Sequence, residues 1–362
     1  MLLYVRIEDS LKRKADELVS RGLYPDFNTV TTVALQNLII AEEEAAQSPG
    51  TSVGASQPVA DRKTHSAAPP VTPGKVELGK SFEWKEPISV PKKLIVAFPA
   101  DLFRPDQCVP VEKWVFGQQN RVLPAKINAR LFLMLIAERG GEVELFEAAN
   151  EISTRATHAY EFLSGLDKRF AHGKDDQLST GFPEPGSEKA ISRYANHFAA
   201  YESTQGNLTG MLIQWKLVGV KRVKNKTYLL PTKACLDFAA LENPLLDRPI
   251  VEKPTEKFSA EEVSWAVDHL CKNVPVEASA FTTILNGVHE GFNTPDAIDG
   301  YVRGHAMEKS DISEPFVSTQ RSGAVSRMAD LNLVRRQRDG TKVVYEVTEL
   351  GEKWQKNGRG KR

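Results

Sequence analysis

Residues 323–354 read GAVSRMADLNLVRRQRDGTKVVYEVTELGEKW, a stretch that predicts a helix, a hairpin and a second helix. Asp339-Gly340 stands between two runs that we expect to form strands, and this pair favours the tight turn of a two-stranded hairpin. Thr348 follows the second run and is a good N-cap for the closing helix. The stretch therefore predicts a small α+β unit whose first strand is strongly basic.

A second stretch has the same order of elements. Residues 206–238 read GNLTGMLIQWKLVGVKRVKNKTYLLPTKACLDF. Without gaps, Leu217 aligns with Leu333 and Thr232 aligns with Thr348, which predicts two related helix–hairpin–helix units. Because the match is short and mostly apolar, a chance similarity of two such units is the alternative.

Helical patterns precede the first of these units. Apolar spacing predicts helices at about 124–139 and 154–169, joined through two glycines and residues 146–152. Residues 171–187 are rich in Gly, Pro and Asp, and we expect them to form a loop.

Between the two units, we expect the helical pattern to end and a new helix to begin. Three prolines interrupt the helical periodicity in residues 243–257. Ser259 and Glu262 then have the spacing of a capping box, in which the hydroxyl and the carboxylate bond reciprocally to backbone N–H groups at the start of a helix. We therefore expect a helix to start directly after Ser259.

Both units resemble the recognition helix and wing of winged-helix domains, a variant of the helix-turn-helix. The resemblance implies that the helix before each hairpin enters the DNA major groove and that the hairpin touches the backbone. The DNA-contacting residues implied are Lys221, Arg222, Lys224 and Lys226 in the first unit, and Arg321, Arg327, Arg335, Arg336, Arg338 and Lys342 in the second. The alternative is that these units bind a protein and that their basic strands are solvated surface.

The N-terminal residues predict a separate small module. Residues 3–7 alternate as a half-buried strand does, a helical pattern follows and ends at Gly22, and Asn28 is a good N-cap for a second helix. One strand and two amphipathic helices bury little apolar surface, so we expect this module to dimerise.

The segment LYVRIEDSLKRKADELVSRGLYPDFNTVTTVALQNLI resembles the ribbon-helix-helix (Arc/MetJ-type) family, and the resemblance covers residues 1–44. It implies a homodimer that places an antiparallel ribbon in the major groove. Tyr4 and Arg6 would face the bases, while Asn28 and Thr29 would hold a phosphate at a helix N-terminus. Residues 1–47 contain five basic and eight acidic residues. The alternative is therefore that the module only dimerises the protein.

Charge is balanced over the chain but not along it. The 362 residues include 47 Lys and Arg and 47 Asp and Glu, which argues mildly against a protein that coats DNA. However, residues 203–241 contain six basic residues and one acidic residue, and residues 316–362 contain eleven and five. Positive charge is therefore concentrated in the two hairpin-containing stretches.

Other sequence features exclude several classes of protein. No stretch approaches the roughly 18 apolar residues of a membrane span, so we expect no membrane contact. The three cysteines are widely spaced and favour neither a disulfide framework nor a zinc site. Phosphate loops, nucleophile elbows and ligand-spaced histidines are missing from the sequence, so we expect no enzyme, no cofactor and no metal site.

These observations predict a mainly α fold with small β hairpins, in the α+β class. The expected domains are a ribbon-helix-helix module (1–44), a disordered linker (45–80), two winged-helix-like domains (81–243 and 258–357) and a basic tail (358–362). The expected function is sequence-specific binding of double-stranded DNA by a dimeric transcriptional regulator, in the cytoplasm and associated with the nucleoid. The alternatives are a plasmid replication initiator or partition protein, and an antitoxin-like component of a mobile or defence system whose C-terminal domains bind a protein partner.

Overall fold

The computed structural model describes residues 13, 14, 16, 108–173, 176–340 and 342–359. The chain divides into two parts, residues 1–77 and residues 78–362, and nearly all described residues belong to the second. The ribbon-helix-helix module and the linker predicted from the sequence lie outside the described residues, apart from three helical positions at 13, 14 and 16.

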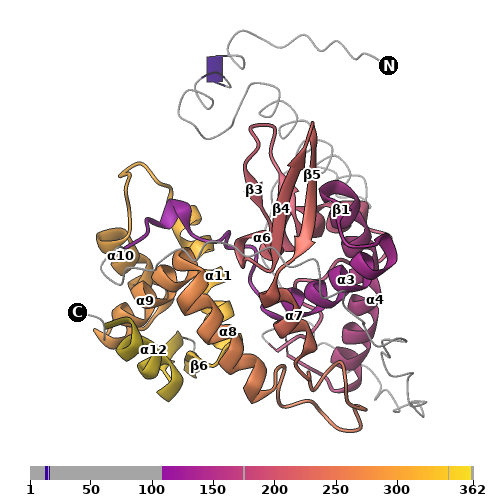
Figure 1. The fold of residues 1–362 in the computed structure, drawn as a ribbon. Helices are drawn as coiled ribbons and strands as arrows, with labels where there is room; N and C mark the ends of the chain where they lie inside the picture. The colour runs from indigo at the N-terminus through magenta and orange to yellow at the C-terminus, as the bar shows by residue number, and fades with distance from the viewer. Residues whose placement is uncertain (1–12, 15, 17–107, 174–175, 341, 360–362) are drawn as a thin grey trace, which may run out of the picture. The chain divides into compact units, whose positions relative to one another are not determined.

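The described residues of the second part form an α+β fold in which helix predominates (Figure 1). The helices are α3 (Leu123–Arg139), α4 (Leu145–Arg169), α5 (Glu188–Tyr194), α6 (Met211–Gln214), α7 (Lys233–Ala240), α8 (Ala260–Asn273), α9 (Pro275–His289), α10 (Pro295–His305), α11 (Glu314–Asp330) and α12 (Glu349–Arg359). The strands are β1 (Val143–Glu144), β2 (Tyr201–Glu202), β3 (Leu208–Thr209), β4 (Val218–Val223), β5 (Lys226–Pro231), β6 (Val334–Asp339) and β7 (Lys342–Val347). The α+β class predicted from the sequence is confirmed.

The strands form three small antiparallel sheets. β1, β5 and β4 make a three-stranded sheet in that order, while β2 pairs with β3 and β6 pairs with β7. Each sheet is short, so helices supply most of the buried core, which runs continuously from Val111 to Trp354.

Local sequence signals place several helices correctly. α3 spans the predicted residues and ends at Gly140, which has a φ of 83°. α8 begins with the predicted capping box, because the Ser259 hydroxyl accepts from the Glu262 N–H and the Glu262 carboxylate accepts from the Ser259 N–H. Residues 171–173 and 176–187 form no helix or strand, as predicted.

Two predictions of helix length were wrong. α4 begins at Leu145 instead of residue 154, because Glu144 caps it and its buried apolar face extends one long helix back to β1. The helix predicted before the first hairpin is only the single turn α6. Gly210, at a φ of 101°, interrupts the preceding residues, which pair as strands β2 and β3.

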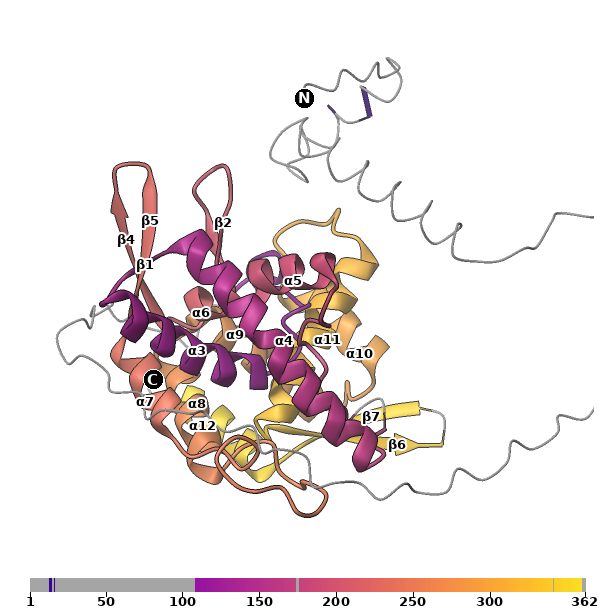
Figure 2. The same ribbon diagram turned by 90° about the vertical axis from the view of Figure 1, so that its right-hand side faces the viewer.

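The two hairpins have the same backbone geometry at the same spacing along the chain. Val218 pairs with Pro231 in the first, and Val334 pairs with Val347 at the equivalent positions of the second (Figure 2). Each hairpin is entered through a non-glycine residue of positive φ, Lys216 at 55° and then Asn332 at 61°.

Matching hydrogen bonds close the two units. The Thr232 N–H donates to Leu217 O at 3.2 Å, and the Thr348 N–H donates to Leu333 O at 3.1 Å. Both threonine hydroxyls donate back to the carbonyl of the positive-φ residue and accept an N–H from the next helix. The predicted similarity of the two units is therefore present in the backbone, which argues against a chance match.

Replacing the first of these threonines should destabilise the fold. Thr232→Ala removes an N-cap and leaves buried carbonyl groups with fewer donors, so we expect the free energy of unfolding to fall by about 1–2 kcal/mol. Thr232→Ser keeps the hydroxyl and should lose well under half of that. Urea unfolding of the full chain measures the free energy of unfolding of both variants. Equal losses in the two would show that the missing methyl group, and not the N-cap, causes the destabilisation.

The described fold has two halves, which we define as residues 123–240 and residues 260–359. Helix α8, at the start of the second half, contacts the first half through buried polar side chains. Lys126 Nζ of α3 lies 2.9 Å from Glu262 Oε1 and donates to Phe238 O and Leu241 O. Burial lowers the pKa of Lys126 to about 8, although the Glu262 carboxylate opposes this shift. Farther along α8, His269 Nε2 lies 2.7 Å from Trp215 O. The two winged-helix-like domains predicted from the sequence thus share one interior.

Residues 108–122 also connect the two halves, because they lead directly into α3 of the first half and pack on the second half. The Val111 N–H donates to Ala306 O at 2.6 Å. Gly117 and Gly323 meet backbone to backbone, and a Cβ added to Gly323 would lie 2.1 Å from Gly117 O. A Cβ added to Gly117 would lie 2.1 Å from Thr319 O, so neither position has room for a side chain.

Candidate nucleic-acid interface

Four sequence-predicted contacts lie outside the described residues. These are Tyr4, Arg6, Asn28 and Thr29 of the ribbon-helix-helix module. The remaining ten lie in the two hairpins and in α11.

A groove of about 590 Å³ lies between α11 and β6, and we call it the α11–β6 groove. Helix α11 provides one wall and strand β6 the other. It is lined by Arg121, Asp176, Lys257, Ser322, Val325, Ser326, Ala329, Asp330, Asn332, Val334, Arg335, Arg336, Arg338 and Tyr345. The lining contains five cationic side chains and two carboxylates, so the groove is basic.

The Asp330 carboxylate in this groove is already neutralised. Its Oδ1 lies 3.1 Å from Lys257 Nζ and 3.7 Å from Arg121 Nη1, and its Oδ2 accepts the Val122 N–H at 3.0 Å. The Asp330 side chain is only 3% exposed. Because its charge is compensated, it does little to repel an anion in the groove.

The basic residues of β6 lie at the surface. Arg335, Arg336 and Arg338 are exposed and line the α11–β6 groove, and Lys342 is exposed at the start of β7. Arg335 stands opposite Glu346 in the strand register, and Glu346 accepts a hydrogen bond from Gln337 at 2.5 Å. The structure therefore brings together three of the predicted arginines in one groove.

The two predicted arginines of α11 do not face the solvent. Arg327 is fully buried, where its guanidinium forms a bidentate ion pair with Glu277 and donates to Gln119 O at 2.5 Å. The prediction that Arg327 contacts DNA is wrong. Arg321 is 7% exposed and is held by Asp299 at 2.9 Å and by a serine hydroxyl of α11, so it too serves the interior.

The spacing of apolar residues in the sequence indicates that Arg327 is buried. Arg327 follows Ala324 by three residues and precedes Leu331 by four, which places it on the buried face of a helix. By the same spacing, α11 turns Thr319, Ser322 and Ser326 toward its other side. Thr319 and Ser322 are exposed, and these hydroxyl residues were missed because the predictions looked for positive charge.

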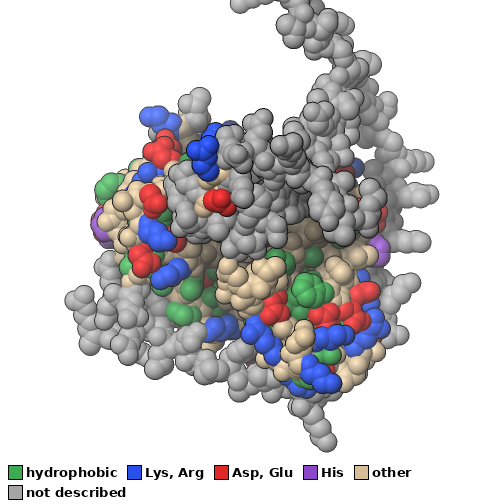
Figure 3. Space-filling model, turned by 90° about the horizontal axis from the view of Figure 1, so that it is seen from above, with side chains coloured by type: hydrophobic (Ala, Val, Ile, Leu, Met, Phe, Trp, Pro, Cys, Tyr) green, Lys and Arg blue, Asp and Glu red, His purple; other side chains and the backbone are tan. Residues whose placement is uncertain are grey.

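The cations of the first hairpin are exposed, but two of them are paired. Lys221 Nζ lies 2.7 Å from a Glu142 oxygen, and Arg222 Nη2 lies 2.8 Å from Glu202 Oε1. Lys224 and Lys226 are exposed at the tip, where Lys224 has a φ of 55°. Within the described surface in Figure 3, Lys and Arg side chains alternate with Asp and Glu rather than forming one continuous basic patch.

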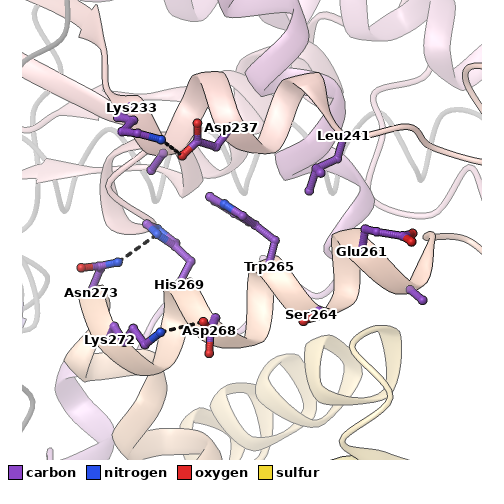
Figure 4. A pocket seen from close by; sticks show the side chains of 12 residues that line it. Lys233, Asp237, Leu241, Glu261, Ser264, Trp265, Asp268, His269, Lys272 and Asn273 are labelled. Carbon is purple, nitrogen blue, oxygen red and sulfur yellow. Dashed lines mark hydrogen bonds and ion pairs between the residues drawn. The ribbon is translucent and has the colours of Figure 1, made fainter.

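A second cleft, of about 810 Å³, lies between α7 and α8 and is drawn in Figure 4. Trp265 points from α8 toward α7 and stacks between Phe238 and His269, with both ring centroids at 4.7 Å. Ion pairs Lys233–Asp237 and Lys272–Asp268 stand on its two rims.

The histidine of this cleft is unsuited to general-base catalysis. His269 uses Nε2 on a backbone carbonyl, and Nδ1 lies 3.2 Å from the Asn273 side-chain nitrogen. Burial lowers the pKa of His269 below its usual value. Both ring nitrogens are occupied, so neither is placed to take a proton from a substrate.

The described residues contain no group of three or more His, Cys, Asp or Glu side chains arranged to hold a metal ion. None of their helices combines the length and apolar character needed to cross a membrane.

Comparison with known proteins identifies no relative of this chain. A scan against protein-family models, a search of curated proteins and a search of solved structures each found no match.

Proposed function

We propose that this chain binds double-stranded DNA through the α11–β6 groove, in the manner of a winged-helix protein. Helix α11 would lie in the major groove and the β6–β7 hairpin against the phosphate backbone. The observation that carries the proposal is the meeting of three exposed β6 arginines with the hydroxyl-bearing face of α11 in one groove.

Each side of the groove suits a different part of a duplex. Arginine guanidinium groups bind phosphate through charge-assisted, often bidentate hydrogen bonds. Hydroxyl groups bond to base edges of either donor or acceptor character. The Ser326 hydroxyl already donates to Ser322 O at 2.8 Å, so it offers its lone pairs to a donor on a base. Phosphate contacts would set the register, and the hydroxyls would add sequence preference.

The biological role that we propose is that of a sequence-specific transcriptional regulator acting on nucleoid DNA. In this proposal residues 1–44 form the ribbon-helix-helix module that makes the protein a homodimer and contacts the operator through Tyr4 and Arg6. A two-fold symmetric dimer requires a palindromic or near-palindromic site.

The repeated hairpin geometry favours a second candidate, a replication initiator. Two hairpin units with the same backbone pairing lie in one fold, and paired winged-helix domains also occur in initiators that bind repeated origin sites. Binding sites at promoters would support the regulator, and binding sites in clustered direct repeats would support the initiator.

A charge placed on the solvent face of α11 tests the groove. Ser322→Asp adds a carboxylate where the proposal places DNA, so we expect about tenfold weaker binding of the full chain to duplex DNA. Ser192→Asp is the matched control, because Ser192 is also an exposed helical serine but lies in α5. Fluorescence anisotropy with a labelled duplex measures both affinities. Equal affinities of the two variants would remove α11 from the interface.

A further inference from the structure

We infer that the turn between β2 and β3, residues 203–207, is a second DNA-contacting element that works together with the tip of the β4–β5 hairpin. We call these two hairpins the paired hairpins. The inference rests on the proposed DNA binding, but none of the residues of these two hairpins lines the α11–β6 groove. Both hairpins project from the same side of the fold in Figures 1 and 2.

A shared carboxylate holds the paired hairpins together. Glu202, at the end of β2, accepts from Arg222 Nη2 at 2.8 Å and from the Thr227 hydroxyl at 2.5 Å. Arg222 Nη2 also donates to Gly206 O in the turn at 2.8 Å. These contacts join one hairpin to each strand of the other, so the two tips are fixed relative to each other.

The turn is also ordered internally. The Ser203 N–H donates to Asn207 O at 2.9 Å, and the Gly206 N–H donates to Ser203 O at 2.8 Å. The Asn207 N–H donates to the Ser203 hydroxyl at 3.0 Å. Gly206 has a φ of 78°, a conformation that suits glycine in a tight turn. A turn that is already ordered loses little conformational entropy on binding.

The exposed side chains of the paired hairpins suit a polyanion. The turn exposes neutral polar side chains, and the hairpin tip exposes an amide and cations. The exposed residues are Thr204, Gln205 and Asn207 in the turn, and Arg222, Lys224, Asn225 and Lys226 at the hairpin tip. None of these is acidic, and the Glu202 carboxylate beside them is paired with Arg222.

These side chains favour nucleic acid over a protein partner. Amides, hydroxyls and lysines are the groups that contact phosphate and sugar oxygens in protein–DNA complexes. The core of a protein–protein interface needs apolar anchors. Val223, which is 41% exposed, is the one large apolar side chain exposed in the paired hairpins. We therefore assign the surface to the backbone of a DNA duplex.

Photo-crosslinking tests this assignment directly. Gln205→Cys in a Cys108→Ser background places a thiol in the turn and removes the exposed native one. The full-length protein is labelled with a photoactivatable aryl azide and mixed with mixed-sequence duplex DNA. Asn150→Cys, on the exposed face of α4, is the control position. We expect the Gln205→Cys protein to crosslink at least fivefold more DNA than the control.

An isosteric change provides an independent measurement. Asn207→Asp adds a negative charge at the turn, and Asn150→Asp adds the same charge on α4. We expect the first to weaken duplex binding about fivefold and the second to leave it within about twofold of the unmodified protein. Circular dichroism of both variants shows whether the fold is retained.

The outcomes separate this inference from the proposed function. Suppose that replacing Arg335, Arg336 and Arg338 weakens DNA binding but crosslinking from position 205 equals that from position 150. The proposal for the α11–β6 groove is then supported, and the paired hairpins do not bind DNA. If crosslinking from position 205 is strong while changes in the α11–β6 groove leave affinity unaltered, the inference holds and the groove proposal fails. Equal affinities of the Asn207→Asp and Asn150→Asp variants would also overturn the inference.

Discussion

Glu277→Gln is expected to lower the free energy of unfolding by about 3–5 kcal/mol, the largest stability loss that we predict for this chain. Glu277 of α9 and Arg327 of α11 form a bidentate ion pair in which both side chains are fully buried. The glutamine has a similar shape but no charge, so the substitution leaves a guanidinium in the core without a counterion. Chemical denaturation of the full-length protein measures the loss.

Two further variants test the physical reason. Glu352→Gln changes an exposed glutamate of α12 that lies 4.0 Å from Lys356, and it should cost no more than about 0.5 kcal/mol. Replacing both buried partners, Glu277→Leu with Arg327→Met, should recover part of the loss, because no unpaired charge remains. Recovery stays incomplete because Gln119 O then lacks the donor that Arg327 supplied. A loss below about 1 kcal/mol in Glu277→Gln would contradict the burial of this pair.

Replacing Arg335, Arg336 and Arg338 together with alanine should weaken DNA binding by about a hundredfold. All three side chains are exposed and line the α11–β6 groove. Each lost phosphate contact costs on the order of 1 kcal/mol, and about 3 kcal/mol corresponds to roughly two orders of magnitude in affinity. Three fewer phosphate contacts should also flatten the slope of log affinity against log salt by about 2.7.

A charge-matched control distinguishes phosphate contact from a general change in net charge. Lys272, Lys309 and Lys356 are exposed and do not line the α11–β6 groove. Changing all three to alanine removes the same total charge. We expect this control to alter affinity by less than about fivefold and to leave the salt slope nearly unchanged. If both triple variants bind alike, the β6 arginines do not touch phosphate.

Elements encoded by neighbouring residues were predictable from the sequence. The β6–β7 hairpin follows from the Asp339-Gly340 turn between two strand-like runs, and α8 follows from its capping box. These signals act over a few residues and need no knowledge of the rest of the chain. The repeated hairpin was visible for the same reason, because Leu217 and Leu333 begin stretches with the same local pattern.

Features that depend on distant partners were not predictable in the same way. Arg327 looked like a DNA-contacting residue because its partner, Glu277, lies fifty residues away in the sequence. β1 and β2 have only two residues each, which is too few to form a periodic pattern. β1 is defined by its pairing with the distant strand β5, and β2 by its pairing with β3 across the turn at residues 203–207. The hydroxyl face of α11 was missed because the prediction relied on positive charge, although the spacing of apolar residues indicates which face of this helix is buried.

The most direct measurement of the central claim is genome-wide footprinting of the tagged full-length protein, beside the variant that lacks Arg335, Arg336 and Arg338. If the α11–β6 groove binds duplex DNA, the unmodified protein protects discrete sites, and the variant loses most of that protection at the same cellular concentration. Sites at promoters support the regulator, and clustered repeats at an origin support the initiator. Identical maps for the two proteins, or no protected sites for either, would contradict DNA binding through this groove.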